Sequence, residues 1–280
     1  MTSTLRPIAA LTRTLPADRG FALIPNRRLY ELYAAMTYAR LLAELLEKTG
    51  AKRPGEFPVA ETRGSEAFLA ASILILDRKD TLAPGPGALV PASMKGLPSA
   101  SRRALLNGSS AHVDWQRSGI VSPHLDLAAQ LDEALRAAES NKKTKNKKLV
   151  LVLCGDPQTN EKILKKAMKR AGEEKLPILF VAHSALGSPE FAATASKYDF
   201  PGIAVDASDA VAVYRVATES AAHARRGNGA TLIECRPWPL TETLPDPITQ
   251  MEEALQRRGI FTKKLQRKTV AAFKQQFVTK

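Results

Sequence analysis

The sequence predicts an α/β fold in which a parallel sheet carries helices on both faces. Short, continuous apolar runs recur in the second half of the chain, and such runs are typical of strands that are covered on both sides. Segments with apolar residues at helical spacing alternate with these runs. The chain has 280 residues, of which 44% are apolar and 25% are charged, so it is long enough and apolar enough to bury a sizeable core.

The segment 149–187 is the centre of this prediction because it reads as a strand, a turn, a helix and a second strand. The first strand is the apolar run from Leu149 to Cys154, and the second is the run from Ile178 to Ala182. The helix between them, which extends to about Glu174, has one apolar face and one lysine-rich face. Its predicted inner residues are Ile163, Leu164, Ala167, Met168 and Ala171. The polar ends of both strands should meet at the carboxyl edge of the sheet, where such folds bind ligands.

The first half of the chain is predicted to be mostly helical. In the helix from Arg27 to Lys48, aromatic and aliphatic residues follow a period of 3.6, which indicates core packing rather than a ligand site. The segment from Thr81 to Gly96 contains Pro84-Gly85-Pro86-Gly87, and its middle is predicted to lack regular structure. Pro123 is predicted to open a later helix. The helices predicted in this half span residues 27–48, 64–76, 99–107 and 123–140.

The second half of the chain supplies the remaining predicted elements. A short helix is expected near residues 191–198. The segment Asp206-Ala207-Ser208 is predicted to cap a long alanine-rich helix, which Gly227 ends. The remaining strands are predicted at residues 203–205 and 231–235, and the remaining helices at residues 209–226, 248–258 and 263–277.

The formal charge of +13 raises the possibility of a nucleic-acid-binding protein. The basic residues are spread along the chain, and the one dense run, Lys142 to Lys148, lies between a predicted helix and a predicted strand. We therefore interpret this run as a solvated turn, and we expect no specific nucleic-acid partner. No apolar run reaches the length of a membrane span, so we expect no membrane partner either.

The compartment is predicted to be the cytoplasm. Cys154 and Cys235 each lie at the end of an apolar strand and read as buried thiols in a reducing environment. Residues 1–25 contain several arginine, serine and threonine residues and read as a flexible tail. If this tail is instead an organellar presequence, the location would be the mitochondrial matrix.

The candidate functional residues lie in the turn Gly155-Asp156-Pro157 and at the end of the next strand, His183-Ser184. Both polar ends lie at the carboxyl edge of the predicted sheet, where such folds bind ligands. The alternative, which we favour from the residues alone, is that Asp156 and Pro157 are the N-cap and first residue of the helix and bind no ligand.

Several short motifs follow one another in a particular order. They are Leu29-Tyr30-Glu31-Leu32-Tyr33-Ala34-Ala35-Met36 with Arg40, Gly64-Ser65-Glu66-Ala67, Gly119-Ile120-Val121 with Pro123, Gly155-Asp156, Lys175-Leu176-Pro177 with Phe180-Val181, Val205-Asp206, Thr231-Leu232-Ile233-Glu234 and Asp246-Pro247-Ile248. In this order they resemble the alpha subunit of the thiamine-diphosphate-dependent 2-oxo acid dehydrogenases of the pyruvate and branched-chain type. The resemblance implies that residues 26–280 form a single thiamine-diphosphate-binding-fold domain with a C-terminal helical extension.

The resemblance also implies a cofactor site. In the family, thiamine diphosphate and Mg²⁺ are bound by a Gly-Asp-Gly motif and by an Asn-Asn pair about 25 residues later. Matched to this sequence, the cofactor-binding residues are Gly119, Val121, Gly155, Asp156 and Pro157, and the metal ligands are Asp156, Ser184 and the carbonyl of Leu186. The expected partner is the beta subunit of a 2-oxo acid dehydrogenase, with self-association as the alternative.

The sequence departs from the family pattern at several of these positions. Pro157 replaces the second glycine, His183-Ser184 replaces the asparagine pair, and the stretch from Arg236 to Asp246 lacks the family's catalytic histidine, so no catalytic residue is predicted. Two functions therefore remain open. One is oxidative decarboxylation of a 2-oxo acid together with a beta subunit. The other is a catalytically inactive homologue that acts as a scaffold or regulator of such a complex.

Overall fold

The computed structural model describes residues 24–48, 63–86, 88–106, 113–237 and 246–277. Five parallel strands form one sheet in the order β1-β2-β3-β5-β4. The strands are β1 (Thr81–Ala83), β2 (Val150–Leu153), β3 (Ile178–His183), β4 (Gly202–Asp206) and β5 (Thr231–Arg236). The predicted α/β class with a parallel sheet is confirmed, and four of the five strands lie where the sequence placed them.

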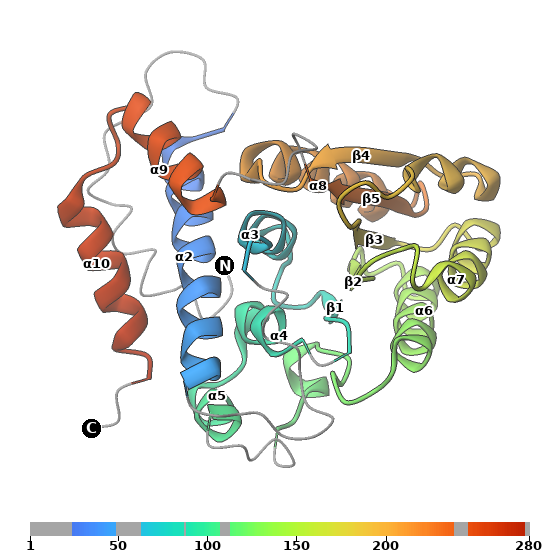
Figure 1. Cartoon of the computed structure of the whole chain (residues 1–280). Coiled ribbons are helices and arrows are strands. Elements are labelled where there is room, and N and C mark those ends of the chain that lie inside the picture. The colour runs from blue at the N-terminus through green and yellow to red at the C-terminus, as the bar shows by residue number, and fades with distance from the viewer. Residues whose placement is uncertain (1–23, 49–62, 87, 107–112, 238–245, 278–280) are drawn as a thin grey trace.

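Helices cover both faces of the sheet, as predicted (Figure 1). Alternate strand residues point to opposite faces: Leu151 and Leu179 belong to one apolar cluster, whereas Val152 and Phe180 belong to the other. The first cluster includes α2 (Asn26–Lys48), α3 (Glu66–Leu74), α4 (Leu89–Gly96), α8 (Ala210–Arg225), α9 (Pro247–Arg257) and α10 (Lys263–Lys274). The second includes α6 (Leu127–Lys143), α7 (Glu161–Glu173) and the 3-10 helix η6 (Ala192–Tyr198).

The central β2-α7-β3 unit forms as predicted. Every residue of β2 is buried, and α7 buries four of its five predicted inner residues against the sheet. The prediction is wrong for Ile163, which is 38% exposed. Its neighbour Leu164 is buried instead, because successive helical residues are rotated by about 100° and only one of the two can face the core.

The C-terminal helices pack on α2, which lies between them and α3 in Figure 1. The tyrosines of α2 make these contacts: Tyr33 meets Phe261 edge to face at 5.5 Å, and Tyr38 meets Phe273 at 5.1 Å. The hydroxyl groups of Tyr30 and Thr269 are hydrogen-bonded. The aromatic residues of α2, which were predicted to lie in the core, therefore form the surface against which the C-terminal helices pack.

The segment 81–96 is more regular than predicted. Its Pro84-Gly85-Pro86 portion is a loop, but β1 precedes this loop and α4 follows it. The three residues of β1 are too few to show a pattern of their own. On its outer side β1 is bridged by Ile120: the amide of Leu82 donates to the carbonyl of Gly119, and the amide of Val121 donates to that of Leu82.

Two predicted helix starts are corrected. Helix α6 begins at Leu127 rather than at Pro123, because the carboxylate of Asp126 accepts the amide of Ala129 and caps it. Helix α8 is capped by Asp209, which accepts two amides, rather than by the segment 206–208. The remaining helix, α5 (Ser99–Leu106), lies within its predicted range.

The two cysteines and the basic run before β2 lie in the environments that the sequence predicted. Cys154 and Cys235 are buried free thiols. Helix α6 ends at Lys143, and the basic run continues as an exposed turn before β2. Among the residues that the structure describes, no helix is long and apolar enough to cross a membrane. Residues 1–23 lie outside the described residues, so the flexible tail, the domain boundary at residue 26 and the cellular compartment stay predictions.

Candidate functional site

A cavity of about 620 Å³ lies at the carboxyl ends of β2 and β3, at the edge where the sequence placed the site. Its floor includes Leu153 and Val181 from the two strands. One wall is α3, and another is the loop and helix start at residues 84–91. The turn that leads into α7 closes a further side. A cavity of this size is in the range of small-molecule sites, which are usually a few hundred to a thousand cubic ångströms.

The turn Gly155-Asp156-Pro157 lies at one rim of the cavity, which Gly155 and Asp156 line and Pro157 does not. Gly155 has a φ of 65°, a left-handed conformation that favours glycine. The carboxylate of Asp156 accepts the amide of Gln158 and the hydroxyl of Thr159, each at 3.1 Å. Helix α7 begins only at Glu161, with Asn160 at its N-cap position. The capping alternative is therefore wrong in detail: Asp156 stabilises a turn that precedes the helix.

His183, at the end of β3, forms the adjacent rim. Its amide donates to the carbonyl of Gly155 at 3.0 Å, which ties the two predicted rims together. The imidazole stacks on Phe68 of α3, with ring centroids 4.7 Å apart. Burial lowers the pKa of His183 from its ordinary value of 6.5, and the negative charge of Asp156 opposes this effect. The lowered pKa favours the neutral form of the ring.

Ser184 points away from the cavity. It is 1% exposed, and its hydroxyl donates to the carboxylate of Glu234 on β5. Glu234 is fully buried and also accepts the amides of Phe191 and Ala192 and a guanidinium nitrogen of Arg236. The oxygen of Ser184 thus belongs to a buried polar cluster that holds the loop after β3 against the sheet.

The other predicted site residues lie outside the cavity lining. Leu186 is 45% exposed in the loop after β3. Val121 is buried in the core beside α6. Gly119 lies at the amino end of β1, and a Cβ atom there would come within 2.7 Å of the Asp80 carbonyl. Its small size is therefore explained by backbone packing. The structure brings Gly155, Asp156 and Pro157 together in one turn and does not bring Gly119 or Val121 to it.

The arrangement of these residues does not fit a magnesium site. Mg²⁺ needs several oxygen ligands in near-octahedral geometry. Asp156 is the one carboxylate among the described residues that line the cavity, and Ser184 directs its hydroxyl to Glu234. The part of the chain that the structure describes also contains no group of three His, Cys, Asp or Glu side chains that could hold a metal ion. The assignment of Asp156, Ser184 and Leu186 as metal ligands stays a prediction.

The cavity is also poorly suited to a diphosphate. Among its described lining residues, Arg63 carries the one permanent positive charge. Its guanidinium is mostly exposed and lies 3.9 Å from the carboxylate of Glu44. Pro157 has no amide hydrogen to offer to a phosphate oxygen. Anion sites normally combine such amides with cationic side chains.

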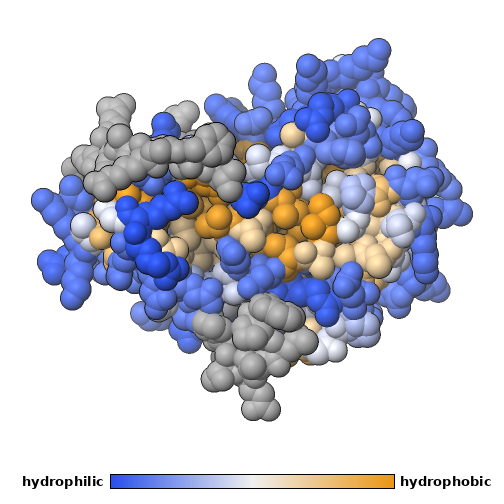
Figure 2. Space-filling view, turned by 90° about the horizontal axis from the view of Figure 1, so that it is seen from above, coloured by the Kyte–Doolittle hydropathy of each residue, from blue (hydrophilic) through white to orange (hydrophobic). Residues whose placement is uncertain are grey.

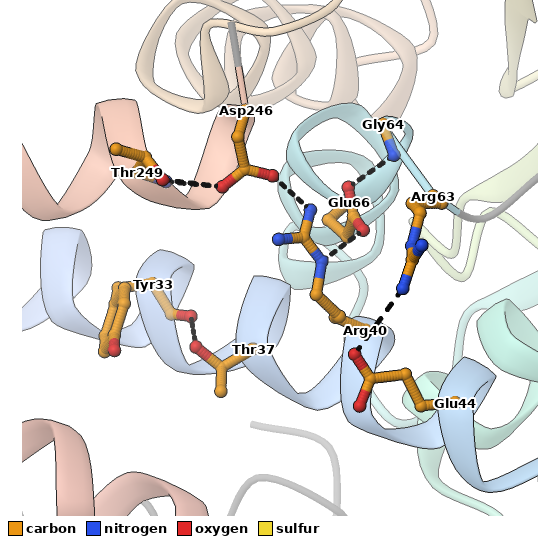
Figure 3. A network of polar contacts seen from close by, with 9 residues as sticks. All are labelled: Tyr33, Thr37, Arg40, Glu44, Arg63, Gly64, Glu66, Asp246 and Thr249. Carbon is orange, nitrogen blue, oxygen red and sulfur yellow. Dashed lines mark hydrogen bonds and ion pairs between the residues drawn. The ribbon is translucent and has the colours of Figure 1, made fainter.

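An ion-pair network lies behind the α3 wall (Figure 3). Arg40 of α2 donates to Glu66 at 2.9 Å and also to Asp246 at the start of α9. Glu66 is fully buried and accepts the amide of Gly64, while Asp246 caps α9 by accepting the amide of Thr249. In the sequence, Arg40, Glu66 and Asp246 belong to three separate motifs. Their partnership joins positions far apart in sequence, which residue spacing could not reveal.

Comparisons with known proteins agree with this architecture. The family described as "Dehydrogenase E1 component" matches residues 90–241, just over half of the chain. The pyruvate dehydrogenase E1 component subunit alpha of Staphylococcus aureus is 27% identical over 224 residues, which cover 75% of this chain and 60% of that protein. The 3-methyl-2-oxobutanoate dehydrogenase subunit alpha of Mycobacterium tuberculosis is 25% identical over 283 residues, which cover 90% of this chain and 77% of that protein.

A structural relative supports the fold alone. Transketolase from Campylobacter jejuni matches 88% of this chain and 47% of its own, with a TM-score of 0.56 and 16% identity. The chain spans less than two thirds of the length of the staphylococcal relative.

Proposed function

Because this chain belongs to the dehydrogenase E1 component family, we propose that it is an alpha-subunit-like protein of a 2-oxo acid dehydrogenase complex that acts as a non-catalytic scaffold or regulator. Its partner would be a beta subunit, since the relatives named above are alpha subunits. In this role it would keep the fold of the family without holding Mg²⁺ and thiamine diphosphate.

The observation that carries this proposal is the position of the Ser184 hydroxyl. In the family pattern this position supplies an amide oxygen to the metal. Here the hydroxyl is buried and donates to Glu234. Rotation of the Ser184 hydroxyl toward a cation would be costly, because the buried Glu234 would lose one of its hydrogen-bond donors.

The exposed surface supports the existence of a partner. Figure 2 shows an apolar strip across the face seen from above, bordered by hydrophilic residues. In Figure 1 this is the side on which α8, α9 and β4 lie. Half-buried apolar residues of these elements include Val205, Val211 and Tyr214. Contiguous apolar surface bordered by polar residues is typical of protein interfaces.

A second function is favoured by the position of the cavity. Gly155 and Asp156 line it at the carboxyl edge of the sheet, where the family resemblance predicts the cofactor. An active alpha subunit would use Asp156 to bind Mg²⁺ and would carry out thiamine-diphosphate-dependent oxidative decarboxylation with its beta subunit.

Calorimetry on the complex purified from its native source separates the two functions. We expect a beta-type subunit to copurify, and we expect no heat of binding when Mg²⁺ and millimolar thiamine diphosphate are titrated in. Turnover of pyruvate or 3-methyl-2-oxobutanoate by the unmodified complex would overturn the non-catalytic proposal. The double variant Pro157→Gly, Ser184→Asn restores two of the family residues and tests whether their loss alone removed cofactor binding, whereas the control Ser196→Ala should leave binding unchanged.

A further inference from the structure

Two aromatic rings that stack on each other, those of Phe68 and His183, line the cavity at the carboxyl edge. Phe68 and His183 come from different elements, and their rings are nearly parallel, with an interplanar angle of 27°. Phe68 is 7% exposed and therefore fixed in the core. Planar ligands bind well to such a surface because offset stacking adds to the burial of apolar area.

Another side of the cavity is preformed. The loop at Pro84-Gly85-Pro86 is restricted by its prolines, and the amide of Gly85 donates to the side chain of Gln130 at 3.0 Å. Gln130 is fully buried and is itself anchored to the carbonyl of Leu125. A ligand would therefore meet a fixed wall and would lose little affinity to the ordering of this loop.

The lining is apolar and almost uncharged. Its largest side chains include Phe68, Leu69, Leu89, Val90, Leu153 and Val181. Cys154 adds no charge, because burial raises the pKa of its thiol to about 12. The two permanent charges, on Arg63 and Asp156, have opposite signs, and both groups have partners within the chain.

We propose that this cavity binds a neutral, planar and largely apolar small molecule, and that it discriminates against anions. The proposal rests on the proposed function, since it assigns a different ligand class to a cavity that would no longer serve magnesium thiamine diphosphate. It follows from the stacked aromatic pair, the preformed loop and the absence of a free cation among the described lining residues. An anion would lose its hydration without gaining a compensating charge.

A pair of planar dyes that differ in charge tests the proposal. Nile red is neutral, and 1-anilinonaphthalene-8-sulfonate carries a sulfonate; both change emission when they leave water. We expect Nile red to bind the full chain with a stoichiometry of one and at least about tenfold more tightly than the anionic dye, a difference of about 1.4 kcal/mol. Equal or tighter binding of the anionic dye would overturn the proposal.

Two substitutions locate the binding. Ala88 and Ala185 line the cavity from different sides and are not fully buried, so Ala88→Trp and Ala185→Trp should fill it without disturbing the core. Each should weaken Nile red binding about tenfold or more. Ala193 is exposed and lies outside the lining, so Ala193→Trp is the matched control and should leave binding unchanged. Unchanged Nile red binding in either cavity variant that folds would overturn the proposal.

Titration with magnesium thiamine diphosphate separates a failure of this inference from a failure of the proposed function. If Nile red fails to bind and the cofactor also gives no heat of binding, the ligand class is wrong and the non-catalytic role stands. If the cofactor binds and displaces Nile red, the non-catalytic role is wrong and so is the selectivity against anions. Binding of Nile red that millimolar cofactor does not displace is the result we expect.

Discussion

Helix α3 has an ion-pair network on one side and the apolar cavity on the other. Glu66, at its first turn, meets Arg40 and, through Arg40, Asp246. Phe68, two residues later, faces His183 and the cavity. Both regions are largely buried, yet one is built from charges and the other almost entirely from apolar groups.

The comparison shows that the charged groups near the site have partners within the chain and do not face the cavity as free charges. In the network every ion has a partner and the carboxylate of Glu66 also accepts an amide, so the cost of removing these groups from water is offset. In the cavity the one described cationic side chain, Arg63, is paired with Glu44, so no unpaired cation is available to a phosphate. The strongest electrostatic contacts near the site therefore join α2, α3 and α9, and they leave ligand binding to shape and apolar contact.

Substitution of Glu66 should have the largest effect. Glu66→Ala leaves Arg40 with one partner in a mostly buried position and leaves the Gly64 amide unpaired, so we expect a loss of about 3 kcal/mol in the free energy of unfolding. Urea unfolding followed by circular dichroism measures it. The control is Glu44→Ala, which removes a long ion pair to the exposed Arg63 and should change stability by less than about 0.5 kcal/mol. Equal losses of stability in the two variants would mean that the buried network contributes no more to stability than the exposed ion pair.

Ser184→Ala should have the next largest effect. It removes one donor from the fully buried Glu234, which keeps its two amides and Arg236, so we expect a loss of about 1.5 kcal/mol. Nile red binding should not change, because the hydroxyl faces away from the cavity. Ser196→Ala, at an exposed position, is the matched control. Loss of dye binding in Ser184→Ala would place the hydroxyl in the cavity instead.

Asp246→Asn should have a smaller and pH-dependent effect. Burial by itself would raise the pKa of Asp246, but Arg40 and Thr249 outweigh it and hold the pKa below 3.8. The depressed pKa stabilises the fold above pH 3.8, and this contribution is lost as the pH falls through the folded pKa. Since the carboxylate is 39% exposed, we expect a difference of only about 0.5 kcal/mol at pH 7. Urea unfolding should show this difference shrinking below pH 3.8, and a constant difference would exclude the ion pair as its cause.

The sheet and most helices could be predicted from the sequence because their signals are local. Continuous apolar runs such as Leu149 to Cys154 require burial on both faces wherever they occur. β1 could not be predicted, since three residues beside a Pro-Gly loop show no period and their pairing with β2 is decided by distant residues. The starts of α6 and α8 were misplaced because several polar residues near each start could act as the cap.

The candidate site was predicted only in part. The Gly155-Asp156 turn and the end of β3 do meet, because adjacent parallel strands end at the same edge. The family assignment, which came from the order of motifs, is also confirmed. The orientation of Ser184 could not be foreseen, since it depends on Glu234, 50 residues later. The stack of Phe68 on His183 gave no sequence signal, because α3 and β3 are far apart in the chain.

The smallest expected effect concerns His183 and Asp156, two titratable groups that line the cavity. Burial lowers the pKa of His183 and the charge of Asp156 raises it, so Asp156→Asn should lower this pKa further. Below its ordinary value of 6.5 the unfolded chain binds the proton more readily than the folded chain, so stability falls as the pH drops from 6.5 toward the folded pKa. Titration of the His183 ring by NMR measures the shift directly. An unchanged pKa of His183 in Asp156→Asn would mean that the carboxylate does not act on the ring, although both side chains line the same cavity.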